Sequence, residues 1–103
     1  MIIVQGWIRL APGGAEKLRA TIAELMTATR QEAGCISYTL SADLVEPDLI
    51  HIAEIWDGKD ALKAHSAAPH AASFGAAMRD AGVEGMNVKG YNAEFWRQIL
   101  GGD

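Results

Sequence analysis

The chain has 103 residues, half of them hydrophobic, and nine basic against thirteen acidic side chains give a formal net charge of −4. This length is that of a single domain, spanning residues 1–103. The acidic balance excludes the basic surface on which nucleic-acid binding depends. No apolar stretch approaches the roughly 20 residues of a membrane-spanning helix, and no signal peptide is expected. We therefore expect a cytoplasmic protein.

The hydrophobic fraction is high for a domain of this size. A chain of about 100 residues hides only about 60–65% of its extended surface on folding, so the apolar surplus predicts a partner subunit, a ligand cavity, or both. Cys35 is the single cysteine and cannot form an internal disulfide, and no cysteine and histidine residues have zinc-site spacing. Glycine-rich phosphate loops and carboxylate-rich metal loops are absent as well. The sequence therefore indicates no nucleotide, flavin or metal.

The N-terminal half predicts two strands with a helix between them. Residues 2–10 (IIVQGWIRL) form a strand that is largely apolar on both faces. Apolar residues then recur at helical spacing over 15–33, and Gly34 suits a C-terminal helix stop. Residues 35–42 (CISYTLSA) alternate, which places Ile36 on the apolar face of a second strand.

The C-terminal half predicts two strands, two short helices and a helical tail. Residues 49–56 (LIHIAEIW) pair with the preceding strand as an antiparallel hairpin. A proline divides the alanine-rich region that follows into helices over about 59–66 and 69–81. A last strand lies around 86–91, and residues 93–100 place their apolar side chains on one face of a short amphipathic helix.

The order β-α-β-β-α-β predicts a ferredoxin-like α+β fold, in which an antiparallel sheet carries both helices on one face. The other face of such a sheet is bare, and the sequence predicts that here it is not polar. A monomer would therefore expose a large apolar patch. We expect a homodimer that covers this patch by packing two sheets face to face, and the alternative is a monomer whose apolar residues are merely scattered.

The motifs of the chain resemble those of the antibiotic biosynthesis monooxygenase (ABM) domain family. Residues 32–38 (EAGCISY) are similar to the family's E-P-G-C-x-x-Y entry to the second strand, with Ala33 where the family usually has proline. The later residues are similar to the family's E-x-W, A-L, H, P-H and F run, and they are Glu54, Trp56, Ala61, Leu62, His65, Pro69, His70 and Phe74. The resemblance implies a ferredoxin-like domain that dimerises through its sheets into an α+β barrel.

The resemblance also implies a range of activities. Family members include cofactor-independent monooxygenases of polycyclic or quinol substrates, haem-degrading proteins, and enzymes that process a phosphorylated autoinducer. We expect a cofactor-independent monooxygenase that oxidises a small aromatic or quinol-type substrate with dioxygen. Such an enzyme needs a base near neutral pH, a hydrogen bond to the resulting oxyanion, and a dry cavity.

His65 and Glu54 are the candidate catalytic residues. A histidine suits the role of base because its ordinary pKa lies near neutrality, and His65 comes late in the helix that follows the third strand. The alternative for His65 is a structural histidine stabilised at a helix C-terminus. Glu54 shares a strand face with apolar residues, which is costly for an unpaired carboxylate, so we expect it to orient a histidine. A salt bridge to Arg9 or Lys89 is the alternative.

The expected substrate-binding residues are mostly aromatic. Tyr38 and Trp56 can stack on a planar ligand, and His70 and Phe74 complete the predicted pocket. The alternatives are core packing for Tyr38 and Trp56, and exposure to solvent for His70.

Other functions of the same fold are distinguished by particular residues. Haem degradation in the family uses an asparagine on the first strand, where this chain has only Gln5. A phosphorylated ligand needs an anion site, for which the cationic candidates are few: Arg9, Lys63, Arg79 and Arg97. A non-catalytic stress module that binds a small ligand is the third alternative, and the sequence alone does not exclude it.

Overall fold

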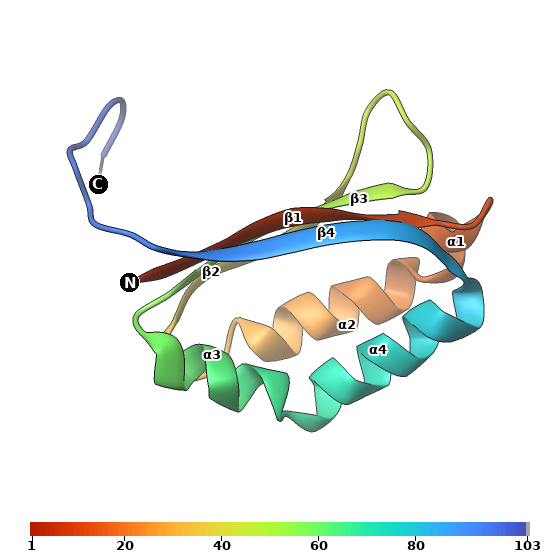
Figure 1. Ribbon diagram of the computed structural model, residues 1–103, viewed down its shortest axis with the longest axis horizontal. Coiled ribbons are helices and arrows are strands. Elements are labelled where there is room, and N and C mark those ends of the chain that lie inside the picture. Colours follow the sequence, from red (N-terminus) through yellow and green to blue (C-terminus); the bar gives the residue numbers. More distant parts are fainter. Residues whose placement is uncertain (103) are drawn as a thin grey trace.

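The computed structural model describes residues 1–102, which form one antiparallel sheet with helices on one of its faces (Figure 1). The four strands are β1 (Ile2–Leu10), β2 (Cys35–Ala42), β3 (Leu49–Trp56) and β4 (Val83–Asn92), in the order β2-β3-β1-β4. The helices are α1 (Gly14–Lys17), α2 (Arg19–Thr29), α3 (Lys59–Ser66) and α4 (Pro69–Ala81). This arrangement confirms the predicted ferredoxin-like α+β fold.

The core lies between the sheet and the helices. Side chains alternate along each strand, so β1 turns Ile2, Val4 and Ile8 toward the helices, and all three are buried. On the helix side, Ile22 and Leu25 of α2 are buried against them. Burial of a side chain of this size stabilises the fold by about 1.5–3 kcal/mol. No residue of α4 is fully buried, so α4 covers the sheet less completely than α2. None of the described helices is long and apolar enough to cross a membrane.

The first helical region is shorter and less continuous than the predicted helix over 15–33. It is divided at Leu18 into α1 and α2, and α2 ends at Thr29. The next residues leave the helix through tight turns, in which the Glu32 N–H donates to the Thr29 carbonyl at 3.0 Å. Gly34 ends these turns with a φ of 82°, a conformation that favours glycine. The turn therefore brings Glu32 toward α3 instead of extending α2.

Ile36 does not lie on the apolar face of β2 as predicted. The register of β2 against β3 shifts between Cys35 and Ser37, so one extra residue is inserted at this point. A bulge of this kind breaks the alternation of side chains, and Ile36 is 59% exposed while Tyr38 is buried. The sequence could not show this because the pattern of residues fits unbroken alternation equally well.

The end of the chain also differs from the prediction. The last strand, β4, is longer than the predicted 86–91, and the segment 93–100 contains no helix. Its apolar side chains Phe95, Trp96 and Ile99 are exposed. A segment of eight residues is too short to hold a helix without packing against other elements. In Figure 1 this tail leaves the sheet on the side away from the helices.

Candidate active site

One carboxylate and two histidines meet below the sheet, where α3 and α4 join. Oε2 of Glu32 lies 2.7 Å from Nδ1 of His65 and 2.8 Å from Nε2 of His70. Glu32 comes from the turn after α2, His65 from the last turn of α3, and His70 from the first turn of α4. Glu32 is 33 and 38 residues away from the two histidines in sequence, so only the packing of these elements brings it to them.

The carboxylate determines which ring nitrogens carry protons. An ionised carboxylate only accepts hydrogen bonds, so the nitrogens that face Glu32 must be N–H donors. When the His65 ring is neutral, its Nδ1 therefore carries the proton and its Nε2 carries the free lone pair. His65 Nε2 has no hydrogen-bond partner in the described chain. His65 is thus oriented as a base with a free lone pair.

Glycine at position 34 is needed for the turn that carries Glu32. A Cβ at this position would lie 2.6 Å from Oδ1 of Asp57 and 2.5 Å from Cβ of Ala61, at a φ that side chains rarely adopt. Cys35 follows at once and begins β2. The E-x-G-C motif therefore has a structural reason, since it ends the turn against α3 with the carboxylate facing the histidines.

Two aromatic side chains enclose the His65 ring. The ring centroid of Trp56 lies 5.0 Å away and that of Tyr38 lies 5.3 Å away. Trp56 is completely buried and Tyr38 is 5% exposed, so neither offers a free face for stacking. Burial raises the pKa of the Tyr38 hydroxyl, which keeps it protonated. These rings therefore form the wall that holds His65 in a medium of low polarity.

Glu54 is buried on the same side of the sheet but bonds to a different partner from the one expected. Its Oε1 accepts a hydrogen bond from Nε1 of Trp56 at 2.8 Å. Burial raises the pKa of Glu54, and the indole hydrogen bond opposes this shift only in part. The alternative salt bridge is not formed, because Arg9 pairs with Glu46 at 2.7 Å on the other face. Glu54 thus fixes the tryptophan that packs against His65, and Glu32 is the carboxylate that contacts the histidines.

The two carboxylates of the site have opposite pKa shifts. Burial acts to raise the pKa of Glu32, but hydrogen bonds from His65 and His70 outweigh it, and the pKa is lowered. Glu32 therefore stays ionised and holds the histidines in place, whereas Glu54, whose pKa is raised, binds a proton more readily than an ordinary glutamate. Opposite shifts of this kind are typical of functional sites.

The helix side of β4 is partly uncovered. Pairing with β1 places Met86, Val88 and Gly90 on the face that looks toward the helices. Met86 and Val88 are 53% and 42% exposed, and a Cβ at Gly90 would meet no atom within 4 Å. Gly90 and Glu54 both pair with Val4, from opposite sides. An uncovered apolar strip therefore lies two strands away from Glu54.

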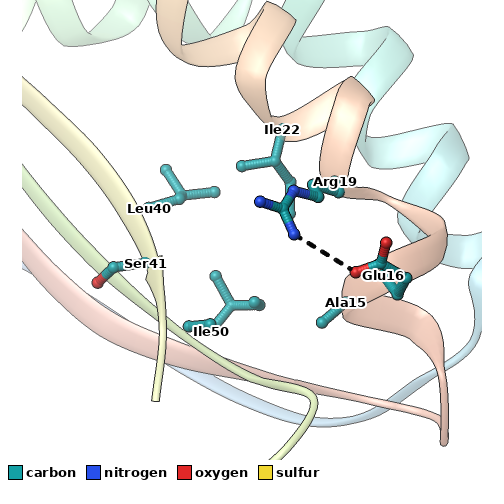
Figure 2. Close-up of a pocket in the computed structure, with 8 residues that line it drawn as sticks. Ala15, Glu16, Arg19, Ile22, Leu40, Ser41 and Ile50 are labelled. Carbon is teal, nitrogen blue, oxygen red and sulfur yellow. Dashed lines mark ion pairs between the residues drawn. The ribbon is translucent and has the colours of Figure 1, made fainter. Parts of the chain in front are cut away.

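A separate hollow of about 410 Å³ lies at the other end of the sheet, between α2 and the edge strand β2 (Figure 2). Its lining includes Ile22, Leu40 and Ile50, with Arg19 and Glu16 paired at 3.7 Å at its rim. It contains none of the predicted site residues. The cluster of Glu32, His65 and His70 and this hollow therefore lie in different parts of the molecule.

The structure places the predicted site residues in different surroundings. The structure brings His65 and His70 together, although exposure to solvent was the alternative for His70. Phe74 is half-buried against the core. Glu32 was not among the predicted site residues. Its place in the E-x-G-C motif, two residues before the turn glycine Gly34, was the available signal.

Residues 1–77 match the family model described as antibiotic biosynthesis monooxygenase. The chain belongs to this family. A crystal structure of a Deinococcus radiodurans protein named after the same family is 32% identical, with a TM-score of 0.88 and coverage of 98% of this chain and 100% of that one. A protein of Pseudomonas aeruginosa, PA3566, is 26% identical with a TM-score of 0.80, over 91% of this chain and 94% of that one.

A curated relative, an uncharacterized protein of Synechocystis sp., is 32% identical over 73 residues, which is 71% of this chain. The chain spans about half the length of this relative. The similarity therefore concerns the domain, and the function of the domain has to be argued from its site.

Two activities expected of ABM relatives find little support in the geometry. Gln5, the one amide side chain on the first strand, pairs with Ala53 and faces away from the helices, on the side of the sheet opposite His65. A phosphorylated ligand would need a cation near His65. The candidate cations lie elsewhere, with Arg9 bonded to Glu46, Lys63 and Arg79 exposed on helices, and Arg97 stacked on Trp96 in the tail.

Proposed function

We propose that this ABM protein is a cofactor-independent monooxygenase of an aromatic or quinol-type substrate. The observation that carries the proposal is the hydrogen bond from His65 Nδ1 to Glu32, which leaves Nε2 of His65 as a base with a free lone pair beside buried aromatic rings. A carboxylate that orients a histidine is the same device that activates bases in other enzymes. Membership of the ABM family supports a monooxygenase-like role.

His65 would remove the proton that starts the reaction. Deprotonation of a phenolic substrate by Nε2 gives a phenolate with anionic character at a ring carbon, which can transfer an electron to dioxygen. Combination of the two radicals forms a carbon–oxygen bond, and the protonated His65 returns its proton to the peroxide oxygen. Loss of water from the resulting hydroperoxide, with the hydrogen of the same ring carbon, leaves a carbonyl group. One oxygen atom ends in the product and the other in water. Glu32 stabilises the protonated histidine that forms on the way.

The substrate would lie on the open strip of β4. Val88 and Met86 offer exposed apolar surface on the helix side, and the space above Gly90 is free of other atoms. Pockets for aromatic ligands are mainly apolar with a few placed polar groups. His70 and Phe74, at the start and middle of α4, would border this strip from the helix layer, while Tyr38 and Trp56 would hold His65.

The test is oxygen uptake by the purified protein with a panel of dihydroxynaphthalene-type quinols. We expect His65→Ala to lower the rate by at least about 100-fold, the usual contribution of a general base. His51→Ala is the matched control, because His51 is on the opposite face and bonds to Asp43 at 2.7 Å. Uptake no faster than autoxidation across the panel, or equal rates for the two variants, would contradict the proposal.

We further propose that the protein acts as a homodimer that packs through the open face of the sheet. The face is mixed, with Ile3, Trp7 and Ile55 half-buried among polar neighbours. The β2–β3 loop and the C-terminal tail rise beyond this face on the side away from the helices (Figure 1). Both carry exposed apolar side chains, such as Leu44 and Trp96. A second copy would cover these groups, since exposed apolar patches of this kind mark interfaces.

A further inference from the structure

Glu32, His65 and His70 bring three potential metal ligands to one point. Each residue offers one ligand atom, a carboxylate oxygen or a ring nitrogen, and these atoms all lie within 4.8 Å of one another. Oε2 of Glu32 is 2.7 Å from Nδ1 of His65 and 2.8 Å from Nε2 of His70. Ligands that bind one ion at about 2.0–2.2 Å are themselves about 3–4 Å apart. We propose that these three atoms bind one divalent transition-metal ion.

The donor set selects the class of ion. Two imidazoles and one carboxylate favour ions such as zinc, cobalt, nickel, copper or ferrous iron, whereas magnesium and calcium prefer oxygen ligands alone. Glu32 supplies the negative charge, and neutral histidines supply two lone pairs. An ion can enter from solvent, because the side chain of His70 is 28% exposed while those of Glu32 and His65 are 17% and 10% exposed. Three protein ligands leave further coordination positions for water or a ligand.

Metal binding would change the tautomer of His65. The ion takes the lone pair of Nδ1, so the ring proton moves to Nε2, and His65 no longer has a lone pair to act as a base. This consequence rests on the proposed function, while binding of the ion does not. Zinc and the proton-abstracting reaction would therefore compete for the same histidine.

Binding is tested by calorimetric titration with zinc chloride and by visible absorption with cobalt chloride. We expect one ion per chain and a cobalt ligand-field band. Glu32→Gln, which keeps a hydrogen-bond acceptor, and His70→Ala should each raise the dissociation constant at least tenfold, while His51→Ala should leave it unchanged. Circular dichroism would establish that each variant is folded. Equal affinity of Glu32→Gln, His70→Ala and wild type would overturn the site.

A second measurement needs no variant. Long-range ¹H–¹⁵N spectra report the protonation of each ring nitrogen of the three histidines. Saturating zinc should move the signals of His65 and His70, with the His65 proton on Nε2, and leave those of His51 in place. Unchanged signals of His65 and His70 under saturating zinc would overturn the proposal.

Oxygen uptake separates this inference from the proposed function. We expect zinc to suppress turnover of an active quinol and a chelator to restore it. Zinc binding in a protein that oxidises no quinol would support the metal site and contradict the monooxygenase. Turnover without any zinc binding would support the monooxygenase and overturn the metal site.

Discussion

At the scale of single residues, the site depends on two glutamates that differ in partner. Glu32 accepts hydrogen bonds from two histidines, and Glu54 accepts one from an indole. Both side chains are largely removed from water, but only Glu32 has partners, the two histidines, that can carry a positive charge. The partners therefore decide which carboxylate remains ionised, and this decides which one can hold a base in place.

Substitution of Glu32 should make the free energy of unfolding less dependent on pH in the acidic range. The lowered pKa of Glu32 means that its stabilising contribution is present above its ordinary pKa and is lost as the pH falls through the lowered value. We expect Glu32→Gln to lower the free energy of unfolding by about 1–3 kcal/mol at pH 7. The difference from wild type should shrink below about pH 4, as measured by urea unfolding across this range.

A matched comparison for this prediction is Asp43→Asn. Asp43 also bonds to a histidine, His51, and this hydrogen bond, together with those from the backbone N–H groups of Glu46 and Val45, lowers the pKa of Asp43 to about 2. In the single chain the side chains of His51 and Asp43 are 48% and 26% exposed, against 10% and 17% for His65 and Glu32, so water screens this pair more strongly. Asp43→Asn should therefore cost less stability than Glu32→Gln, and a larger cost would contradict the importance of burial at the histidine cluster.

Substitution of Glu54 should change the free energy of unfolding at neutral pH in the opposite direction. Its raised pKa means that the folded state binds the proton more tightly than the unfolded chain, so stability is greatest below the ordinary pKa and falls as the pH rises through the raised value. Glu54→Gln keeps an acceptor for Trp56 and removes the buried charge. We expect it to be about 0.5–1 kcal/mol more stable than wild type at pH 7.5 and equal at pH 4. Thermal unfolding at both values tests this, and a less stable variant at pH 7.5 would contradict it.

At the scale of elements, three strands and the two helices after β3 were predictable, since α3 and α4 have the predicted bounds, whereas the passage from α2 to β2 was not. The bounds of β1, β2 and β3 match the predicted ranges because alternation of apolar residues directly follows the pleat of a strand. The bulge at Ile36 and the turn at Glu32 depend on contacts with other elements, which a local pattern does not contain. The two positions lie at either side of Cys35, where the chain passes from α2 to the sheet.

The pairing of β1 with β4 is unusually close at one glycine, and this gives a test of the sheet. A Cβ at Gly6 would lie 2.1 Å from the carbonyl oxygen of Asn87 and 2.6 Å from Cα of Val88, both of which are backbone atoms. We expect Gly6→Ala to lower the free energy of unfolding by about 2–3 kcal/mol or more, at the upper end of the cost of overpacking. Chemical denaturation would measure the loss.

Gly90 is the matched control on the neighbouring strand. A Cβ there would meet nothing within 4 Å, and alanine restricts the unfolded chain more than glycine does. Gly90→Ala should therefore be at least as stable as wild type. A bulkier Gly90→Leu should remain folded and raise the KM for an active quinol, because the side chain would occupy the proposed substrate strip. An unchanged KM would place the substrate elsewhere.

At the scale of the whole molecule, the apolar surplus is divided between the two sides of the sheet. Part of it forms the core under the sheet, and part is exposed in the β2–β3 loop, the C-terminal tail and the helix side of β4. A domain of this size cannot bury all of these groups by itself. The proposed dimer and the proposed substrate strip account for different exposed regions, so they can be tested independently.

A charge in the middle of the open face should separate the dimer without unfolding the chain. Ala53 lies on the central strand β3 and is exposed, so a glutamate there has water around it in a monomer and an apolar partner in a dimer. We expect Ala53→Glu to shift the protein from dimer to monomer in light scattering at micromolar concentration. Ala20→Glu, on an exposed position of α2, should remain dimeric. A monomeric wild-type protein would contradict the proposed assembly.

The sequence by itself determined the order of the strands and main helices and the ABM family, because these follow from local periodicity and short motifs. It also named His65 as the candidate base from the type of residue and its place late in a helix, and that role stays a prediction. Only the tertiary structure decided which carboxylate contacts the histidines. Glu32 and Glu54 lie 22 positions apart, and both are acidic residues within family motifs. The turn at Gly34 directs Glu32 to the junction of α3 and α4, whereas the pleat of β3 places Glu54 next to Trp56 of the same strand. The contacts of Glu32 come from elements distant in sequence, and a local pattern does not specify them.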